Sequence, residues 1–153
     1  MLDSIIEESR EKLFKYREKR IHPLKDDKIL TDWNGLMIAS FALAGQVLDD
    51  KEYVRAAEKA AEFVQKNLTT KKGKLLKRFR LGKAGLSPHL DDYSFMIWGL
   101  LNLYEATFNV DYLSRAVDLM TIMVEDFSDG NGGFYIGSKD SEKLMVRAKD
   151  SYD

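Results

Sequence analysis

Two short polar clusters each precede a long apolar run, and they hold the side chains best suited to chemistry. The clusters are residues 32–34 (DWN) and residues 89–93 (HLDDY). Carboxylates accept hydrogen bonds from sugar hydroxyls, and an aromatic ring packs against the face of a pyranose. Two carboxylates can also divide acid and base roles when their environments separate their pKa values. These residue types therefore point to a carbohydrate ligand.

Within the two clusters we assign different candidate roles to different side chains. The candidates for catalysis are Asp92, Asp91 and His89, because a histidine beside carboxylates can act as a general base. The candidates for substrate binding are Asp32, Trp33, Asn34 and Tyr93.

Each of these residues also has a purely structural interpretation. An aspartate at a helix start can stabilise the helix by accepting hydrogen bonds from free amides, which would account for Asp32 and Asp91. Asp92 follows such a cap, which makes it the better site candidate. Tryptophan is highly buried on average, so Trp33 is expected in the core more readily than in a site. A loop histidine such as His89 is usually solvated.

The elements that would position these clusters are mainly helical. Residues 32–48 and 93–104 are apolar on all sides, which predicts helices buried all round. Residues 50–68 and 110–127 are apolar on one face only and are expected to be outer helices. Asp32 or Thr31 is expected to cap the first buried helix, and Asp49-Asp50 the helix after it.

Less regular segments surround this helical part. Residues 2–20 indicate a one-faced, partly exposed leading helix. Short strand-like runs occur at residues 74–80, 134–136 and 144–146, and the last two could pair. We interpret the basic residues at 77–80 as a solvated strand face, with anion binding as the weaker alternative.

The same parts recur at an offset of 59 residues, as in the pairs Asp32/Asp91, Tyr53/Tyr112 and Gly73/Gly132. Stacked repeats bury the apolar faces that a single repeat cannot bury alone. Buried helices alternating with one-faced helices predict an all-α fold with minor β hairpins, a fragment of an α/α toroid. The expected division of this single partial domain, residues 1–153, is a leading helix at 2–20, repeat one at 32–80 and repeat two at 91–146.

Two repeats form an open arc, so the inner helices should expose apolar edges. Large exposed apolar patches usually find a partner, and we expect self-association or contact with the remainder of a full-length toroid.

Composition excludes several classes of function. The net charge is −1, with 24 basic and 25 acidic residues, which gives no reason to expect nucleic acid binding. The sequence has no cysteine and two distant histidines, so we expect no metal site and no cofactor. The uncharged run at residues 33–48 is too short for a membrane span, and the charged N-terminus does not resemble a signal peptide. We therefore expect a cytoplasmic protein with no membrane contact.

Three stretches resemble the YyaL-like family, which includes the spermatogenesis-associated proteins with a thioredoxin-like domain. They are DDKILTDWNGLMIASFALAG (26–45), HLDDYSFMIWGLLNLYEATF (89–108) and VRAKDSYD (146–153). The resemblance implies a toroid similar to the six-hairpin glycosidases and the N-acylglucosamine 2-epimerases. It also implies that a thioredoxin-like domain and about half of the toroid lie outside this chain. By the same resemblance, Lys149, Asp150 and Tyr152 would lead into a further inner helix and line the cavity.

Two hypotheses of function follow. The first is part of a carbohydrate-processing toroid, isomerase- or epimerase-like or glycosidase-like, with a possible sugar ligand; the chain alone is expected to be inactive. The alternative is a non-catalytic scaffold or binding module that accompanies the thioredoxin-like domain. Convergence of the candidate side chains on one cavity would favour the first.

Overall fold

The computed structural model describes residues 2–142 and 145–149, and this part of the chain is mainly helical. Its elements are α1 (Leu2–Arg17), β1 (Ile29–Leu30), α2 (Thr31–Leu48), α3 (Lys51–Asn67), β2 (Arg78–Arg80), β3 (Lys83–Gly85), α4 (Leu90–Thr107) and α5 (Val110–Phe127). The predicted fold class, all-α with a small amount of β structure, is confirmed.

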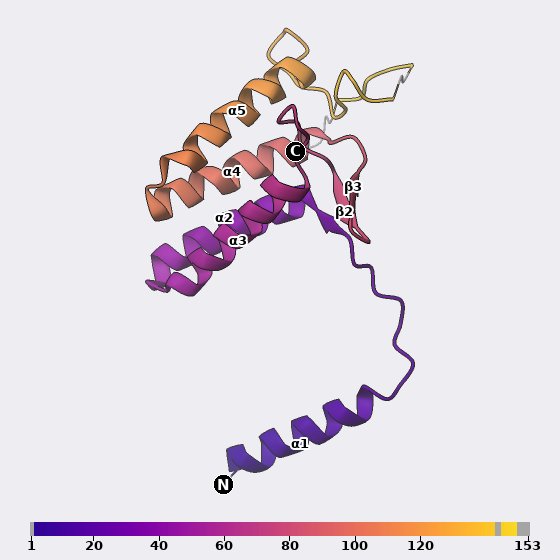
Figure 1. Ribbon diagram of the computed structural model, residues 1–153, viewed down its shortest axis with the longest axis vertical. Helices are drawn as coiled ribbons and strands as arrows, with labels where there is room; N and C mark the ends of the chain where they lie inside the picture. Colours follow the sequence, from indigo (N-terminus) through magenta and orange to yellow (C-terminus); the bar gives the residue numbers. More distant parts are fainter. Residues whose placement is uncertain (1, 143–144, 150–153) are drawn as a thin grey trace.

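The helices α2 and α4 lie side by side and run in the same direction (Figure 1). They approach closely at two glycines. A Cβ atom on Gly35 would lie 2.5 Å from the carbonyl carbon of Phe95, and one on Gly99 would lie 2.8 Å from the carbonyl oxygen of Gly35. Residue numbers therefore rise in the same direction along both helices, so α2 and α4 are parallel. We refer to them as the inner helices.

The outer helices α3 and α5 pack against α2 and α4 respectively (Figure 1). Their one-faced patterns place Ala57, Ala61 and Val64 of α3 and Ala116 and Leu119 of α5 in the core. The core is therefore continuous across the arc formed by both helical hairpins.

The 59-residue offset recurs in the backbone. Helices α2 and α4 begin at residues 31 and 90, and each is followed by a C-cap residue in the left-handed conformation, Asp49 or Phe108. The next residue, Asp50 or Asn109, caps the following outer helix with its side chain. The predicted capping by Asp50 is confirmed, and the two hairpins are built by the same local rules.

The turns after the outer helices repeat in the same way. Isolated bridges join Thr69 to Leu75 and Ser128 to Phe134. Each turn contains a glycine with positive φ, Gly73 at 81° or Gly132 at 90°, which a residue without a Cβ adopts without strain.

The strands are shorter than the sequence suggested. Strand β2 pairs with both β1 and β3, whereas residues 74–77 are not in a strand. Residues 134–136 form only the bridge at Phe134, although the N–H of Ile136 donates to the carbonyl of Ala148. Leu144, part of the other expected strand, lies outside the described residues.

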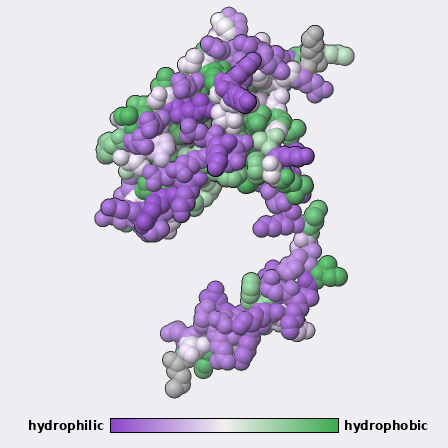
Figure 2. Space-filling view, in the orientation of Figure 1, coloured by the Kyte–Doolittle hydropathy of each residue, from purple (hydrophilic) through white to green (hydrophobic). Residues whose placement is uncertain are grey.

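Helix α1 stands away from the other helices, at the end of an extended segment (Figure 1). None of its described residues is buried, and its surface is largely hydrophilic (Figure 2). The expected leading helix is present, but its apolar residues Ile5, Leu13 and Phe14 are exposed and pack against nothing in the described part of the chain.

The sequence predicted inner helices that are buried on all sides, but each inner helix has an exposed apolar side in the structure. Trp33, Met37 and Leu43 are exposed on α2, and Trp98 and Leu101 on α4. The expected apolar edges of an open arc are thus present. In the described residues, no helix combines the length and apolar character needed to cross a membrane.

Candidate functional site

Two of the predicted carboxylates meet at one lysine. The Nζ atom of Lys77 lies 2.6 Å from Oδ2 of Asp32 and 3.3 Å from Oδ1 of Asp92. The backbone N–H of Asp32 also donates to Oδ1 of Asp92, at 3.0 Å. The Asp32–Lys77–Asp92 cluster therefore ties together the first turns of α2 and α4.

The small sheet brings Lys77 to this place. Leu30 of β1 is paired with Arg78 of β2, and the N–H of Thr31 donates to the carbonyl of Lys77 at 3.1 Å. The hydroxyl of Thr31 donates to the carbonyl of Leu76 at 2.5 Å. Lys77 is therefore fixed beside the start of α2 by backbone pairing across more than 40 residues of sequence.

The cluster is largely removed from water, and burial governs its protonation. Asp92 is 0% exposed, and burial raises the pKa of its carboxyl group, although the N–H of His89 and the Lys77 ammonium act in the opposite direction. Burial also tends to lower the pKa of Lys77, but the bonds to Asp32 and Asp92 outweigh it and the net shift is upward. Lys77 is therefore a cation and a hydrogen-bond donor near neutral pH.

The capping roles differ from those expected. Helix α2 begins directly after Leu30, and neither Thr31 nor Asp32 acts as its N-cap. The Asp32 carboxylate instead accepts from the N–H of Trp33 at 2.8 Å. At α4 the N-cap residue is His89 and not Asp91, and Asp92 forms a capping box by accepting from the N–H of His89 at 2.7 Å.

A cavity of about 690 Å³ lies at this end of the inner helices. Its polar lining includes Lys77, Ser87, His89, Ser141 and Glu142. His89 is exposed, and Asp92 fixes its backbone from behind. The structure thus brings His89, Lys77 and, behind Lys77, the two carboxylates Asp32 and Asp92 to one cavity.

The other predicted site residues do not line this cavity. Trp33 is 69% exposed, so its expected place in the core is wrong. The side chain of Asn34 donates to the carbonyl of Leu30 at 2.7 Å. Tyr93 is buried against Phe127 with its hydroxyl accepting from the N–H of Leu75, and Asp91 is exposed.

The tail residues have a different place from the one expected. Lys149 pairs with Asp129 and lies 5.2 Å from the centre of the Tyr135 ring, and it is not among the cavity residues. Asp150 and Tyr152 lie outside the described residues.

Sequence reasoning missed the basic part of the cavity. Lys77 and Arg78 were interpreted as a solvated strand face, which is wrong for the buried pairing of Lys77. Arg147 also lines the cavity, and its position in the family-like stretch at 146–153 was an available signal. Among the residues that the structure describes, no group of three or more acidic or histidine side chains is placed to hold a metal ion.

The parallel inner helices, the returning outer helices and the cavity at the inner N-termini define an arc of an α/α toroid. The fold matches an alpha-mannanase of Bacteroides thetaiotaomicron with a TM-score of 0.67 at 20% identity, over 75% of this chain and 34% of the mannanase. A cellobiose 2-epimerase of Bacillus thermoamylovorans matches with a TM-score of 0.68 at 20% identity, over 84% of this chain and 36% of the epimerase. An unsaturated glucuronyl hydrolase of Bacillus sp. GL1 gives a TM-score of 0.65 at 18% identity, over 86% of this chain and 39% of the hydrolase. At these identities the likeness concerns the fold alone.

At the sequence level the chain is homologous to part of spermatogenesis-associated protein 20. It is 36% identical to the rat protein and 34% identical to the human protein, over 94% of this chain in each case. It is also 35% identical to an uncharacterised protein of Caenorhabditis elegans over 97% of this chain. The chain spans about a fifth of the length of these relatives. No family model matches the chain. The resemblance to the spermatogenesis-associated proteins is thus confirmed for that fifth.

Proposed function

We propose that the cavity at the N-terminal ends of α2 and α4 binds a carbohydrate, as one side of the site of a longer toroid. The observation that carries this proposal is that His89 and Lys77 line that cavity together, with Lys77 held by the buried carboxylates of Asp32 and Asp92. A volume of about 690 Å³ lies within the range of small-molecule sites. The structural neighbours named as epimerase and glycoside-processing enzymes support a sugar as the ligand class.

His89 is the side chain best placed for proton transfer. It lines the cavity, and histidine is the side chain that most often acts as a general acid or base. Asp92 is a positioning residue in this proposal, because it is fully buried and holds the backbone of His89. We therefore assign the proposed proton transfer to His89 and not to Asp91 or Asp92.

This arrangement favours isomerisation of a sugar over hydrolysis of a glycoside. Glycoside hydrolysis usually needs two carboxyl groups facing the scissile bond. Among the described residues that line the cavity, Glu142 is the one carboxylate. A histidine and a single carboxylate fit the removal and return of a proton better than a carboxylate pair would.

The test is calorimetric titration of the chain with mono- and disaccharides. The variant His89→Ala should weaken binding by about tenfold, since it removes a polar contact at the cavity wall. His22→Ala is the matched control, because His22 is exposed near Glu18 and lies outside the cavity. Equal affinity of both variants and the parent chain, or no binding of any sugar, would contradict the proposal.

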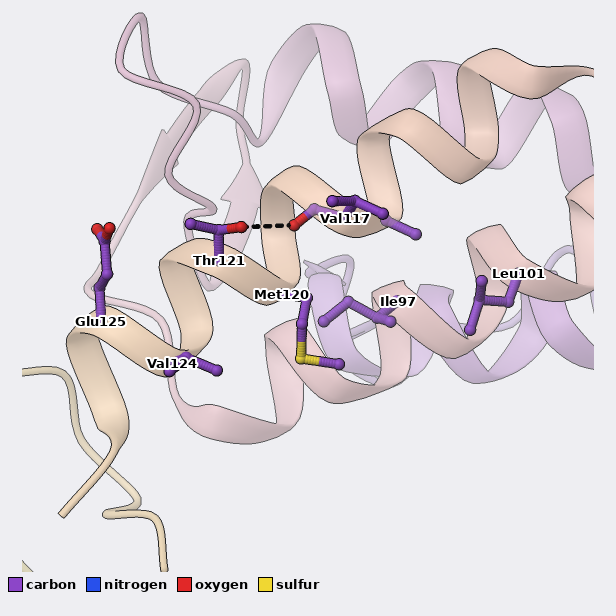
Figure 3. A pocket seen from close by; sticks show the side chains of 8 residues that line it. Ile97, Leu101, Val117, Met120, Thr121, Val124 and Glu125 are labelled. Atoms are coloured by element: carbon purple, nitrogen blue, oxygen red, sulfur yellow. Dashed lines mark hydrogen bonds between the residues drawn. The ribbon is translucent and has the colours of Figure 1, made fainter. Parts of the chain in front are cut away.

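A second candidate function is that of a scaffold within a larger assembly, and one observation favours it. An apolar groove of about 440 Å³ runs between α4 and α5, where Ile97, Leu101, Met120 and Val124 line it (Figure 3). Such a groove suits further helices, from the rest of a full-length toroid or from a second copy. In this alternative the chain serves a thioredoxin-like domain and binds no sugar.

A further inference from the structure

The cavity has a strongly basic wall. Four cationic side chains line it, Lys28, Lys77, Arg78 and Arg147, against the carboxylate of Glu142 among the described residues. Two of these cations are already paired, Lys28 with Asp26 at 2.7 Å and Lys77 with Asp32 and Asp92. The remaining two, Arg78 and Arg147, carry no ion pair with any described residue.

The sheet determines where Arg78 points. Side chains alternate between the two faces along a strand, so Arg78 and Arg80 share one face of β2 and Phe79 takes the other. Phe79 packs edge-to-face on Phe63 of α3, with ring centres 5.3 Å apart, and thereby fixes the core face. Arg80 pairs with Asp27 at 2.6 Å. The Nε atom of Arg78 is buried and has no hydrogen-bond partner in the described structure.

Arg147, which comes from the C-terminal part of the chain, also lines the cavity and is held by several contacts. Its terminal nitrogen donates to the carbonyl oxygens of Asp126, at 2.9 Å, and Gly137, at 2.7 Å. Its guanidinium group lies 4.1 Å from the centre of the Tyr135 ring. Its Nε atom is also buried without a partner among the described residues.

Arg78 and Arg147 both line the cavity, and the Nε atom of each has no hydrogen-bond partner among the described residues. A buried donor left unsatisfied is costly, and such groups in native proteins usually mark a bound ion, water or ligand. A guanidinium group matches the planar fork of a carboxylate and also binds phosphate oxygens.

We infer that the sugar bound in this cavity carries an oxyanion, a carboxylate or a phosphate, which the guanidinium groups of Arg78 and Arg147 bind. This inference rests on the proposed carbohydrate site and adds the charge of the substrate. Glu142 at the same wall disfavours a second negative group, so the ligand has one oxyanion and neutral hydroxyls elsewhere.

The experiment is NMR titration of the chain with glucose, glucuronate, glucose 6-phosphate, acetate and inorganic phosphate, each alone. Glucuronate or glucose 6-phosphate should bind at least about tenfold more tightly than glucose, and the tighter of the two identifies the oxyanion. Arg78→Gln and Arg147→Gln should each remove about tenfold of that preference. Arg80→Gln is the matched control, because it removes an arginine from the same strand face outside the cavity. Glu142→Gln should strengthen binding of the acidic sugars.

The outcomes separate this inference from the proposed function. If glucose binds as tightly as glucuronate and glucose 6-phosphate, and the arginine variants change nothing, the oxyanion inference is overturned while the sugar site stands. If acetate or inorganic phosphate binds as tightly as the acidic sugars, the oxyanion site stands and the carbohydrate proposal fails. If none of the probes binds, both fail. Circular dichroism of each variant confirms that the fold is intact before its titration is compared.

Discussion

Asp92 has no exposed surface, and its two carboxylate oxygens bind parts of the chain that are far apart in sequence. One oxygen accepts from the N–H of Asp32 and lies 3.3 Å from Lys77, and the other accepts from the N–H of His89. A buried carboxylate with this many partners stabilises the joint between the two inner helices. Its neighbour Asp91 is exposed and has no comparable role.

Replacement of Asp92 should therefore cost far more stability than replacement of Asp91. Asp92→Ala leaves Lys77 with one partner and two backbone N–H groups unsatisfied, and we expect a loss of about 3 kcal/mol in the free energy of unfolding. Asp91→Ala should change it by less than about 0.5 kcal/mol. Urea unfolding of both variants measures the difference, and equal losses would contradict the structural role of Asp92.

The pairing of Asp129 with Lys149 should make the stability of the fold depend on pH in the acid range. Its hydrogen bond with Lys149, together with the N–H groups of Asn131 and Gly133, lowers the pKa of Asp129 from 3.8 to about 2. A carboxylate with a lowered pKa stabilises the fold above its unfolded value, and this contribution is lost as the pH falls from about 4 to about 2. The stability gap between the parent chain and Asp129→Asn should therefore be present at pH 5 and close by pH 2. A gap that is constant over this range, in guanidinium unfolding at each pH, would show that the pairing does not matter.

At the scale of elements, the central joint is the close contact of α2 with α4. Gly35 and Gly99 allow it, since a Cβ atom at either position would overlap the backbone of the other helix. The contact sets the separation of the two inner N-termini and thereby the position of Lys77 between Asp32 and Asp92.

Gly35→Ala should push the inner helices apart. We expect a net loss of about 1–3 kcal/mol, since overpacking outweighs the gain in helix propensity. Gly85→Ala is the control, because no atom lies within 4 Å of its added Cβ, and it should be nearly neutral. Thermal unfolding compares the two, and a more stable Gly35→Ala chain would refute the close-contact argument.

The helices were predictable because their signals are local. The apolar runs, the one-faced outer helices and the cap at Asp50 all arise within a few residues of sequence. The site was less predictable because it depends on distant contacts. Nothing near Lys77 in the sequence indicates that β1 will bring it to Asp32. Trp33 is exposed because no helix of the described residues covers that side of α2.

At the scale of the whole molecule, the chain is an arc with uncovered apolar edges. The groove between α4 and α5 (Figure 3) is lined by apolar side chains, and α2 exposes Trp33, Met37 and Leu43. Self-association, the contribution of a thioredoxin-like domain and a cytoplasmic location stay predictions. The division into a leading helix and two repeats stays one as well.

Met120→Asp places a charge in the groove and should shift the chain towards monomer if copies associate there. Val110→Asp is the control, because Val110 is exposed on the same helix outside the groove. Since Met120 is 42% exposed, the stability of the folded chain should change by less than about 1 kcal/mol. Analytical ultracentrifugation at micromolar concentration measures the mass, and a parent chain that is already monomeric would count against self-association.

The measurement that bears most directly on the carbohydrate site is a map of amide chemical shifts during sugar titration. The account predicts that Ser87, His89, Gly137 and Ser141, which line the cavity, shift together with one affinity. The chemical shifts of amides beside the α4–α5 groove, such as those of Val117 and Thr121, should not change. Shifts confined to the groove, or no shifts with any neutral or acidic sugar, would contradict the account.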